Sequence, residues 1–199
     1  KNDYKIGDTK ISIPPTVLFT AAAILDDATR VVSMDVKRPG DIVYVLGETR
    51  DELGGSEYLA LSGQLGDKVP VVDPSQARAR YEALHQAINT GLVASCHDCS
   101  DGGLGAALAE AAFAGGFGLD LDLAPLGVDD AIVALFSESQ SRFVATVSPD
   151  RAATFETLMN PTGCYKIGAV TETSRLIIKG AVDASLAELK EAWQKPLRY

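Results

Sequence analysis

Apolar residues fall into short runs separated by turn-forming residues, a pattern typical of strands. Residues 41–47 and 143–147 are rich in β-branched and aromatic side chains, and Pro39 with Gly40 marks a turn before the first run. The same pattern predicts strands at residues 31–34, 93–96, 119–123, 164–170 and 176–178. We expect the last two of these to pair with each other.

Segments with helical spacing lie between these runs. Asp73 followed by Pro74 is a typical helix start, and apolar residues continue at helical spacing to about Asn89. Further helices are predicted at residues 102–115, from a cap at 148–150 to 159, and after a cap at Ser185. Strands alternating with helices predict an α/β (α+β) fold, with helices packed on a mixed sheet.

The run at residues 16–25 is almost continuously apolar and ends at Asp26 and Asp27. It predicts a strand that needs cover on both faces, of which the rest of the chain supplies only one. We therefore expect residues 1–27 to be the tail of a preceding domain, and residues 28–199 to form the main domain. An incompletely covered strand also predicts self-association.

Composition narrows the class of protein. The chain has 199 residues, of which 46% are hydrophobic and 23% charged, as in ordinary globular proteins. A net charge of -9 argues against a nucleic-acid partner, which needs a concentrated basic face. The longest apolar stretches are too short, or too rich in Gly and Ala, to predict a membrane span. Three cysteines indicate a reducing compartment, and we expect the cytoplasm.

The strongest candidate site follows the predicted strand at 93–96 and precedes the helix at 102–115. Helix N-termini attract phosphate, and Gly102 and Gly103 leave the backbone open to a ligand. Asp98 and Asp101 offer oxygen ligands for Mg²⁺, and Ser100 can donate to a phosphate. The alternative is structural: Ser100 or Asp101 caps the helix, and the glycines allow tight packing.

Cys96 and Cys99 flank His97 and Asp98 in a spacing that also occurs in zinc and redox sites. Only Cys164 and His85 remain to complete a zinc site, and no thioredoxin-like unit surrounds the pair. Buried structural thiols are therefore the favoured interpretation.

Two further polar segments are candidates. Glu138, Ser139 and Gln140 precede the strand at 143–147 and can contact metal, phosphate or sugar hydroxyls, while Arg142 can pair with an anion. A solvated loop is the alternative. The glycines and serine at residues 54–56 give a weaker signal, which packing of a helix start explains equally well.

Three segments occur in order: Leu53-Gly-Gly-Ser-Glu-Tyr58, His97-Asp-Cys-Ser-Asp-Gly-Gly-Leu104 and Phe136-Ser-Glu-Ser-Gln-Ser-Arg142. Together they resemble the phosphoribosylformylglycinamidine synthase family of the aminoimidazole ribonucleotide synthetase superfamily. The resemblance covers essentially the whole chain and implies the C-terminal domain of that fold, after an ATP-binding-type domain. It also implies a ligase of purine biosynthesis that converts formylglycinamide ribonucleotide to the amidine, using ATP and glutamine-derived ammonia.

By this resemblance, Asp98 matches a Mg²⁺ ligand of the family. The nucleotide contacts are matched by Ser100, Gly102 and Gly103, and the ribonucleotide contacts by Glu138, Ser139 and Gln140. Cys99 stands where the family often has Arg, which removes a phosphate-neutralising charge. The implied partners are the rest of the synthase and a glutaminase subunit or domain, and the tail after Ser185 favours a separate subunit. No catalytic residue is assigned, because the family's amide-activating residues have no counterpart in this sequence. We therefore expect the chain alone to be inactive. The alternatives are a related synthetase or kinase lobe, or a non-catalytic nucleotide-binding module.

Overall fold

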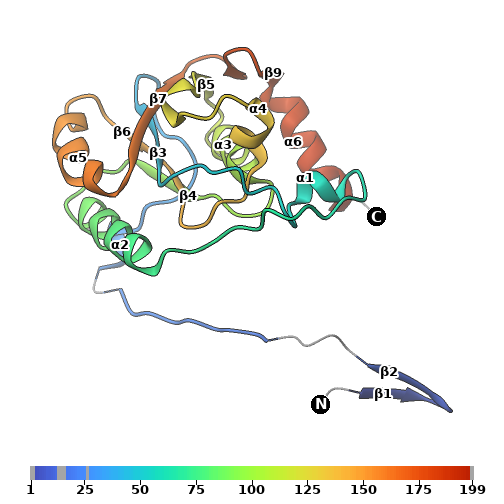
Figure 1. The fold of residues 1–199 in the computed structure, drawn as a ribbon. Coiled ribbons are helices and arrows are strands. Elements are labelled where there is room, and N and C mark those ends of the chain that lie inside the picture. The colour runs from blue at the N-terminus through green and yellow to red at the C-terminus, as the bar shows by residue number, and fades with distance from the viewer. Residues whose placement is uncertain (1–2, 13–16, 26, 198–199) are drawn as a thin grey trace.

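A seven-stranded mixed sheet forms the centre of the molecule (Figure 1). The structure is a computed structural model that describes residues 3–12, 17–25 and 27–197. The strands follow the order β4-β6-β3-β7-β5-β8-β9, and all neighbours are antiparallel except β5 and β8. Their bounds are β3 (Ile42–Leu46), β4 (Ser95–Asp98), β5 (Gly118–Leu121), β6 (Phe143–Val147), β7 (Cys164–Thr171), β8 (Arg175–Ile178) and β9 (Val182–Ser185). The predicted class of fold is confirmed.

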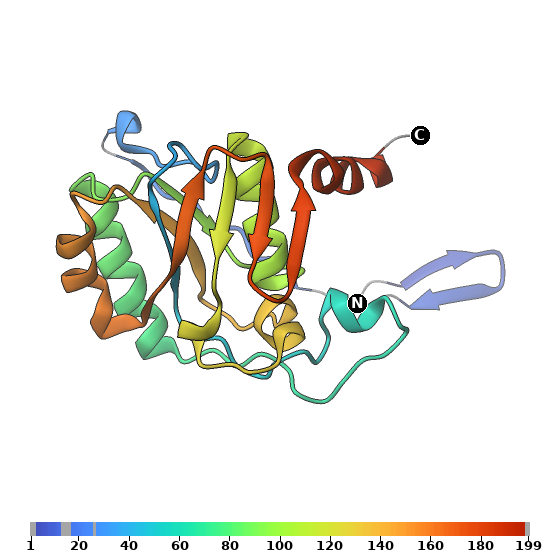
Figure 2. The same cartoon turned by 90° about the horizontal axis from the view of Figure 1, so that it is seen from above.

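Helices cover both faces of the sheet. One apolar cluster joins the sheet to α2 (Pro74–Asn89) and α5 (Ala152–Met159). The other joins it to α3 (Gly103–Gly115), α4 (Ala131–Phe136) and α6 (Leu186–Gln194). Figure 2 shows the strands side by side, with α6 beyond β9. A one-turn helix, α1 (Glu57–Ala60), and the 3-10 turns η1 (Ala28–Arg30), η2 (Ala124–Leu126), η3 (Asn160–Thr162) and η4 (Lys195–Leu197) complete the elements.

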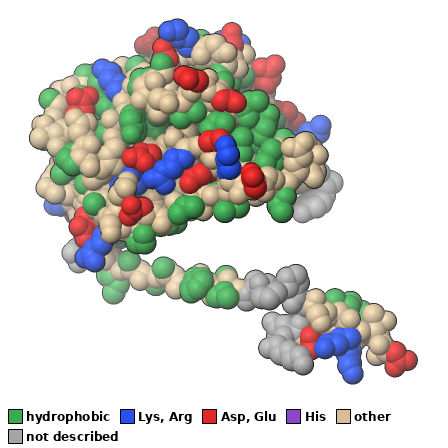
Figure 3. Space-filling view, viewed as in Figure 1, with side chains coloured by type: hydrophobic (Ala, Val, Ile, Leu, Met, Phe, Trp, Pro, Cys, Tyr) green, Lys and Arg blue, Asp and Glu red, His purple; other side chains and the backbone are tan. Residues whose placement is uncertain are grey.

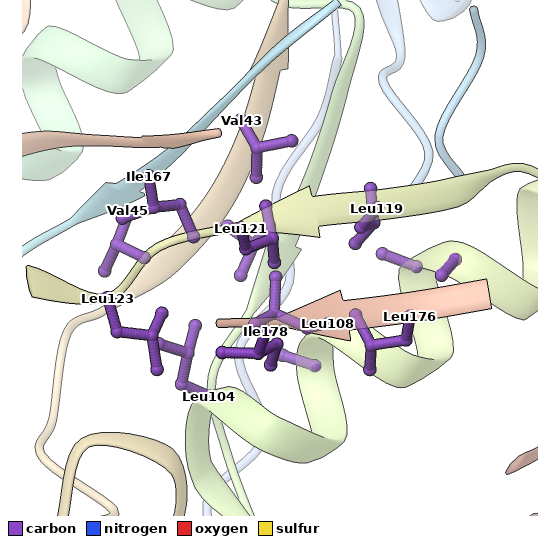
Figure 4. Close-up of a cluster of buried hydrophobic side chains, with 14 of the residues drawn as sticks. Val43, Val45, Leu104, Leu108, Leu119, Leu121, Leu123, Ile167, Leu176 and Ile178 are labelled. Atoms are coloured by element: carbon purple, nitrogen blue, oxygen red, sulfur yellow. The ribbon is translucent and has the colours of Figure 1, made fainter. Parts of the chain in front are cut away.

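The interior strand β3 shows why both faces of the sheet need helices. Val43 and Val45 point into the α3 side of the core, whereas Tyr44 and Leu46 belong to the α2 side. All four are almost fully buried, at 0–1% exposure. Figure 4 shows Val43, Val45 and Leu104 among the apolar side chains of this core. A run that is apolar at every position therefore indicates a strand with helices packed on both of its faces.

Two of the predicted helix caps are confirmed and one is wrong. Asp73 accepts hydrogen bonds from the amides of Ser75 and Gln76, and Ser185 forms a capping box with Glu188. The cap predicted at residues 148–150 is absent: α5 has Arg151 at its N-cap position, without a side-chain cap bond. The amide of Arg151 instead donates to the Ser148 carbonyl, so these residues form a turn that precedes the helix.

Three predictions about strands of the sheet also need correction. Residues 31–34 form no strand, and within the described part of the chain their backbone meets the sheet through the Ser33 carbonyl, which accepts from the Cys96 amide. Strands β7 and β8 do not pair with each other; each pairs with β5, β7 antiparallel and β8 parallel. The predicted strand at 93–96 begins later, at Ser95.

Residues 17–25 contradict the predicted N-terminal strand. They have no regular structure, and their apolar side chains are exposed, Leu18 at 90% and Ile24 at 96%. The first residue of that predicted strand, Thr16, lies outside the described residues. A strand needs a backbone partner, and the described part of the domain offers none here. Figure 3 shows apolar side chains along this extended segment.

A short hairpin precedes this segment. Strands β1 (Asp3–Ile6) and β2 (Thr9–Ser12) pair antiparallel, where the sequence predicted only a turn-like stretch. Figure 2 shows the hairpin apart from the sheet. Tyr4, Ile6 and Ile11 are exposed at 63%, 61% and 48%. Among the described residues, no helix combines the length and apolar character that crossing a bilayer requires.

Candidate functional site

The three segments singled out by the sequence meet at one edge of the sheet. They are residues 53–58 after β3, residues 97–104 at the junction of β4 and α3, and residues 136–142 before β6. Strand β6 runs antiparallel between β3 and β4, and Phe143 at its start lies opposite both Leu46 and Asp98. The end of β3, the end of β4 and the start of β6 therefore share one edge.

Glu138 joins all three segments. Its Oε1 accepts hydrogen bonds from the backbone amides of Gly102 and Glu57, each at 2.9 Å. Its own amide donates to the Glu52 carbonyl at 3.3 Å. A carboxylate at the start of α3 is what the helix dipole favours. The anion position predicted at this helix start is thus occupied by a side chain of the same chain.

Gly102 and Gly103 adopt positive φ angles of 79° and 64°. A Cβ atom on Gly103 would lie 2.6 Å from the Ser137 carbonyl oxygen and 2.8 Å from that of Leu135. Gly102 is the N-cap residue of α3, so neither Ser100 nor Asp101 occupies the cap position. The packing explanation for the glycines therefore has direct structural support.

Asp98 and Ser100 lie together at the surface. The Ser100 hydroxyl donates to Asp98 Oδ2 at 2.5 Å, and the Asp98 side chain is 64% exposed. This hydrogen bond, with a smaller effect of His97, holds the pKa of Asp98 below its ordinary value. Asp98 therefore carries a negative charge at neutral pH. Across the described ranges, no group of three or more His, Cys, Asp or Glu could hold a metal ion.

The segment at 138–140 divides into inward and outward side chains. Ser139 is 2% exposed, and its hydroxyl oxygen accepts from the Arg50 amide at 3.0 Å. Gln140 is exposed, and its Nε2 donates to the Glu138 carbonyl at 3.1 Å. Of these three predicted contact residues, Gln140 is the one whose side chain faces solvent.

Arg142, which the sequence offered as an anion partner, is instead a buried structural cation at 1% exposure. It donates to the Ser139 carbonyl at 3.0 Å, to the Thr49 hydroxyl at 2.8 Å and to the Ser137 carbonyl. Burial lowers its pKa. These acceptors compensate the buried charge, and the guanidinium fixes the course of residues 137–142.

Sequence reasoning missed Arg80, which holds the same loop from α2. Arg80 is 4% exposed and donates to the Thr162 carbonyl at 2.9 Å and the Ser141 carbonyl at 3.0 Å. Ser141 has a φ of 62°, rare for a residue other than glycine. In the sequence, Arg80 lies at helical spacing between Ala77 and Leu84, on the apolar face of the predicted helix. A charged residue on that face was the signal that could have indicated a buried arginine.

The glycines at 54–55 also have a packing role. The Gly54 amide donates to the Lys68 carbonyl at 2.8 Å, and a Cβ on Gly54 would lie 2.7 Å from the Lys68 backbone. Ser56 caps α1, and Tyr58 stacks on Phe136 with ring centroids 4.9 Å apart. This segment therefore packs against residues 136–138.

The three cysteines are free thiols. Burial raises the pKa of Cys96 to about 12, of Cys99 to about 11 and of Cys164 to about 12. Thiolates are the form that binds zinc and exchanges disulfides, so these pKa values disfavour both chemistries. The favoured interpretation, structural thiols, agrees with the geometry.

Comparisons with known proteins agree with this architecture. The sequence profile of "AIR synthase related protein, C-terminal domain" matches residues 38–180. "Phosphoribosylformylglycinamidine synthase subunit PurL" of Limosilactobacillus reuteri (strain DSM 20016) is 35% identical over 190 residues, which are 94% of this chain and 25% of that protein. The chain thus spans about a quarter of the length of this curated relative.

Solved structures share the fold. T. maritima PurL complexed with FGAR aligns with a TM-score of 0.69 and 22% identity, over 81% of this chain and 30% of that one. T. maritima PurL complexed with ATP aligns with a TM-score of 0.62 and 21% identity, over 81% and 27%. The hydrogenase maturation protein HypE of E. coli aligns with a TM-score of 0.56 and 24% identity, over 78% and 52%. At these identities the likeness establishes the fold alone.

Proposed function

The chain belongs to the AIR synthase related protein family, as a C-terminal domain, and from this premise we propose that it is the C-terminal domain of a phosphoribosylformylglycinamidine synthase. Such a ligase uses ATP and glutamine-derived ammonia to convert formylglycinamide ribonucleotide to the amidine in de novo purine biosynthesis. The observation that carries the proposal is 35% identity, over 94% of this chain, to a subunit of that synthase. The meeting of the three polar segments at one sheet edge supports it.

We also propose that residues 1–27 are the tail of a preceding ATP-binding-type domain, and that residues 28–199 form the C-terminal domain. The exposed hairpin and the exposed apolar segment at 17–25 support this division. A lone hairpin is marginally stable in water, and exposed apolar surface marks interaction sites. The partners of this chain would be the rest of the synthase and a glutaminase subunit or domain. Self-association of the chain through this segment stays a prediction.

We assign the nucleotide contacts to Ser100, Gly102 and Gly103, and the ribonucleotide contacts to Glu138, Ser139 and Gln140. The Gly102 amide already binds Glu138, so a phosphate reaches this amide only when the Glu138 side chain moves away. Gln140 needs no such movement, because its side chain is exposed. The remaining contacts come from parts of the synthase beyond this domain.

We propose that Asp98 supplies one ligand of a Mg²⁺ ion. The described residues do not form a closed metal site, but Mg²⁺ is commonly held by one or two carboxylates together with nucleotide phosphates and water. The exposed, ionised Asp98 beside Ser100 fits such a shared site. We place the protein in the cytoplasm, in keeping with its three free thiols.

Calorimetry with the 199-residue chain tests this function. We expect MgADP and formylglycinamide ribonucleotide to bind weakly, with a Kd of about 1 mM, equivalent to about 4 kcal/mol. We expect no amidine formation from ATP, ribonucleotide and ammonia, because most of the synthase is absent. Turnover well above a blank by the chain alone would contradict the assignment of the activating residues elsewhere.

The same experiment separates the alternatives. Binding of MgADP without formylglycinamide ribonucleotide would favour a related synthetase or kinase lobe, a possibility raised by the fold shared with HypE. If neither MgADP nor formylglycinamide ribonucleotide binds, the result would favour a structural module without a nucleotide site, and the proposed function would then be wrong.

A further inference from the structure

His97 connects the candidate site to the interior of the domain. Its side chain is 14% exposed and lies between two carboxylates. The ring Nε2 contacts Glu110 Oε2 on α3 at 2.8 Å, and Nδ1 lies 3.4 Å from Asp98 Oδ1. In a hydrogen bond between the two, the carboxylate oxygen accepts and the ring Nε2–H donates. The ring is therefore anchored to α3 at the point where β4 ends and the loop begins.

Glu110 continues this connection to the C-terminal helix. Its other oxygen, Oε1, accepts a hydrogen bond from the Trp193 indole nitrogen at 2.9 Å. The Trp193 ring also contacts Phe113, one turn further along α3, with centroids 5.6 Å apart. Figure 1 shows α6 beside α3. One carboxylate thus holds the ring at the loop and the indole on α6 at the same time.

We propose that His97 is a positioning residue of the candidate nucleotide site, which fixes the loop carrying Asp98 and, through Glu110, couples that loop to Trp193 on α6. This inference rests on the proposed function for its ligand. A ligand that draws Asp98 into a new position moves the end of β4, and His97 cannot follow without altering its contact with Glu110. Since Glu110 also binds the indole, the surroundings of Trp193 change with occupancy of the site.

Trp193 provides the measurement, because it is the only tryptophan of the sequence. The 199-residue chain is titrated with MgADP while Trp193 emission is recorded, and binding is measured separately by equilibrium dialysis of labelled ADP. We expect emission to change in parallel with binding. His97→Phe removes both ring nitrogens and is expected to abolish the emission response and weaken binding about tenfold, as loss of a residue that orients a ligand group commonly does. His97→Gln is expected to restore both in large part, because its amide can donate to Glu110.

The other histidine of the sequence, His85, provides the matched control. It is exposed on α2 and contacts Asn89, so His85→Phe should bind MgADP and respond like the wild type. Circular dichroism verifies that each variant is folded. Wild-type binding without an emission change, or a His97→Phe variant indistinguishable from the wild type, would overturn the inference.

Failure of the proposed function gives a different result. If the wild type binds no MgADP, the nucleotide site is wrong, and the ligand-free proteins decide the coupling. Trp193 emission that differs between His97→Phe and the wild type then supports the connection through Glu110. Identical emission overturns it.

Discussion

Gly103→Ala tests the contact that brings the candidate segments together. Gly103 begins α3, and the carbonyl groups of Leu135 and Ser137 lie against it. An added Cβ would approach these oxygens to 2.8 and 2.6 Å. Because both are backbone atoms, relief requires movement of the loop that carries Glu138 or of the helix start. The substitution therefore perturbs the junction itself without removing any polar group.

The magnitude follows from three effects. A φ of 64° costs an alanine about 1–2 kcal/mol relative to glycine. Overlap with a packed backbone costs about 1–3 kcal/mol more. The lower entropy of the unfolded alanine variant returns about 0.4–1 kcal/mol. We therefore expect the free energy of unfolding to fall by about 1–4.6 kcal/mol, the sum of these ranges.

Gly116→Ala, at the other end of α3, isolates the overlap. Gly116 has a φ of 75°, and a Cβ built there meets nothing within 4 Å. It shares the backbone cost and the entropy term with Gly103, so we expect a loss of only about 1 kcal/mol. The difference between the two variants measures the contact of residues 135–137 with the helix start.

Urea unfolding, followed by circular dichroism, gives both free energies. Unchanged m-values would show that the native and unfolded states expose similar surface in each variant. Equal losses for Gly103→Ala and Gly116→Ala would refute the close approach of the loop to α3. The arrangement of Glu138 at the helix start would then be wrong as well.

Three further predictions concern the same site. Glu138→Gln keeps an oxygen for the Gly102 and Glu57 amides but loses the negative charge, so the free energy of unfolding should fall by about 1 kcal/mol. Glu138→Ala removes the acceptor as well and should lower it further. Urea unfolding that gives both variants the stability of the wild type would contradict the bridging role. Asp98→Asn should weaken MgADP binding about tenfold, or about 1.4 kcal/mol, in calorimetry, whereas Asp129→Asn, at an exposed carboxylate outside the three segments, should not. Tight binding indifferent to Asp98→Asn would place the site elsewhere. Burial raises the pKa of Cys96 to about 12 and of Cys99 to about 11, so at pH 8 the native thiols should react with Ellman's reagent more slowly than the thiols of the unfolded chain. The thiolate fraction of the native protein should continue to rise above pH 9. A native thiol that reacts fast at pH 8 would be inconsistent with this burial.

Local signals were sufficient where the physical cause is local. Asp73 with Pro74 predicted the start of α2, and Ser185 predicted the start of α6, because a cap satisfies amides only a few residues away. The same reasoning failed at 148–150, where a turn has the same composition as a cap. Strand β9 was missed because Val182–Ser185 is short and offers little alternation to detect.

The candidate site was predictable in its members but not in their arrangement. Polar residues beside glycines predicted the three segments, and antiparallel pairing of β6 with β3 and β4 brings them to one edge. Which side chains face a ligand depends on that assembly. Ser139 and Arg142 point inward and Gln140 outward, although all three are polar residues of one short segment.

The sequence by itself determined the class of fold, the limits of most helices and strands, and the segments that carry the polar chemistry. These depend on periodicity, caps and turns, which act over a few residues. Only the tertiary structure decided that Glu138 fills the helix start, that Arg80 and Arg142 are buried, and that His97 reaches Trp193 through Glu110. Each of these depends on contacts between residues distant in sequence, and such contacts exist only once the strands have paired and the helices have docked.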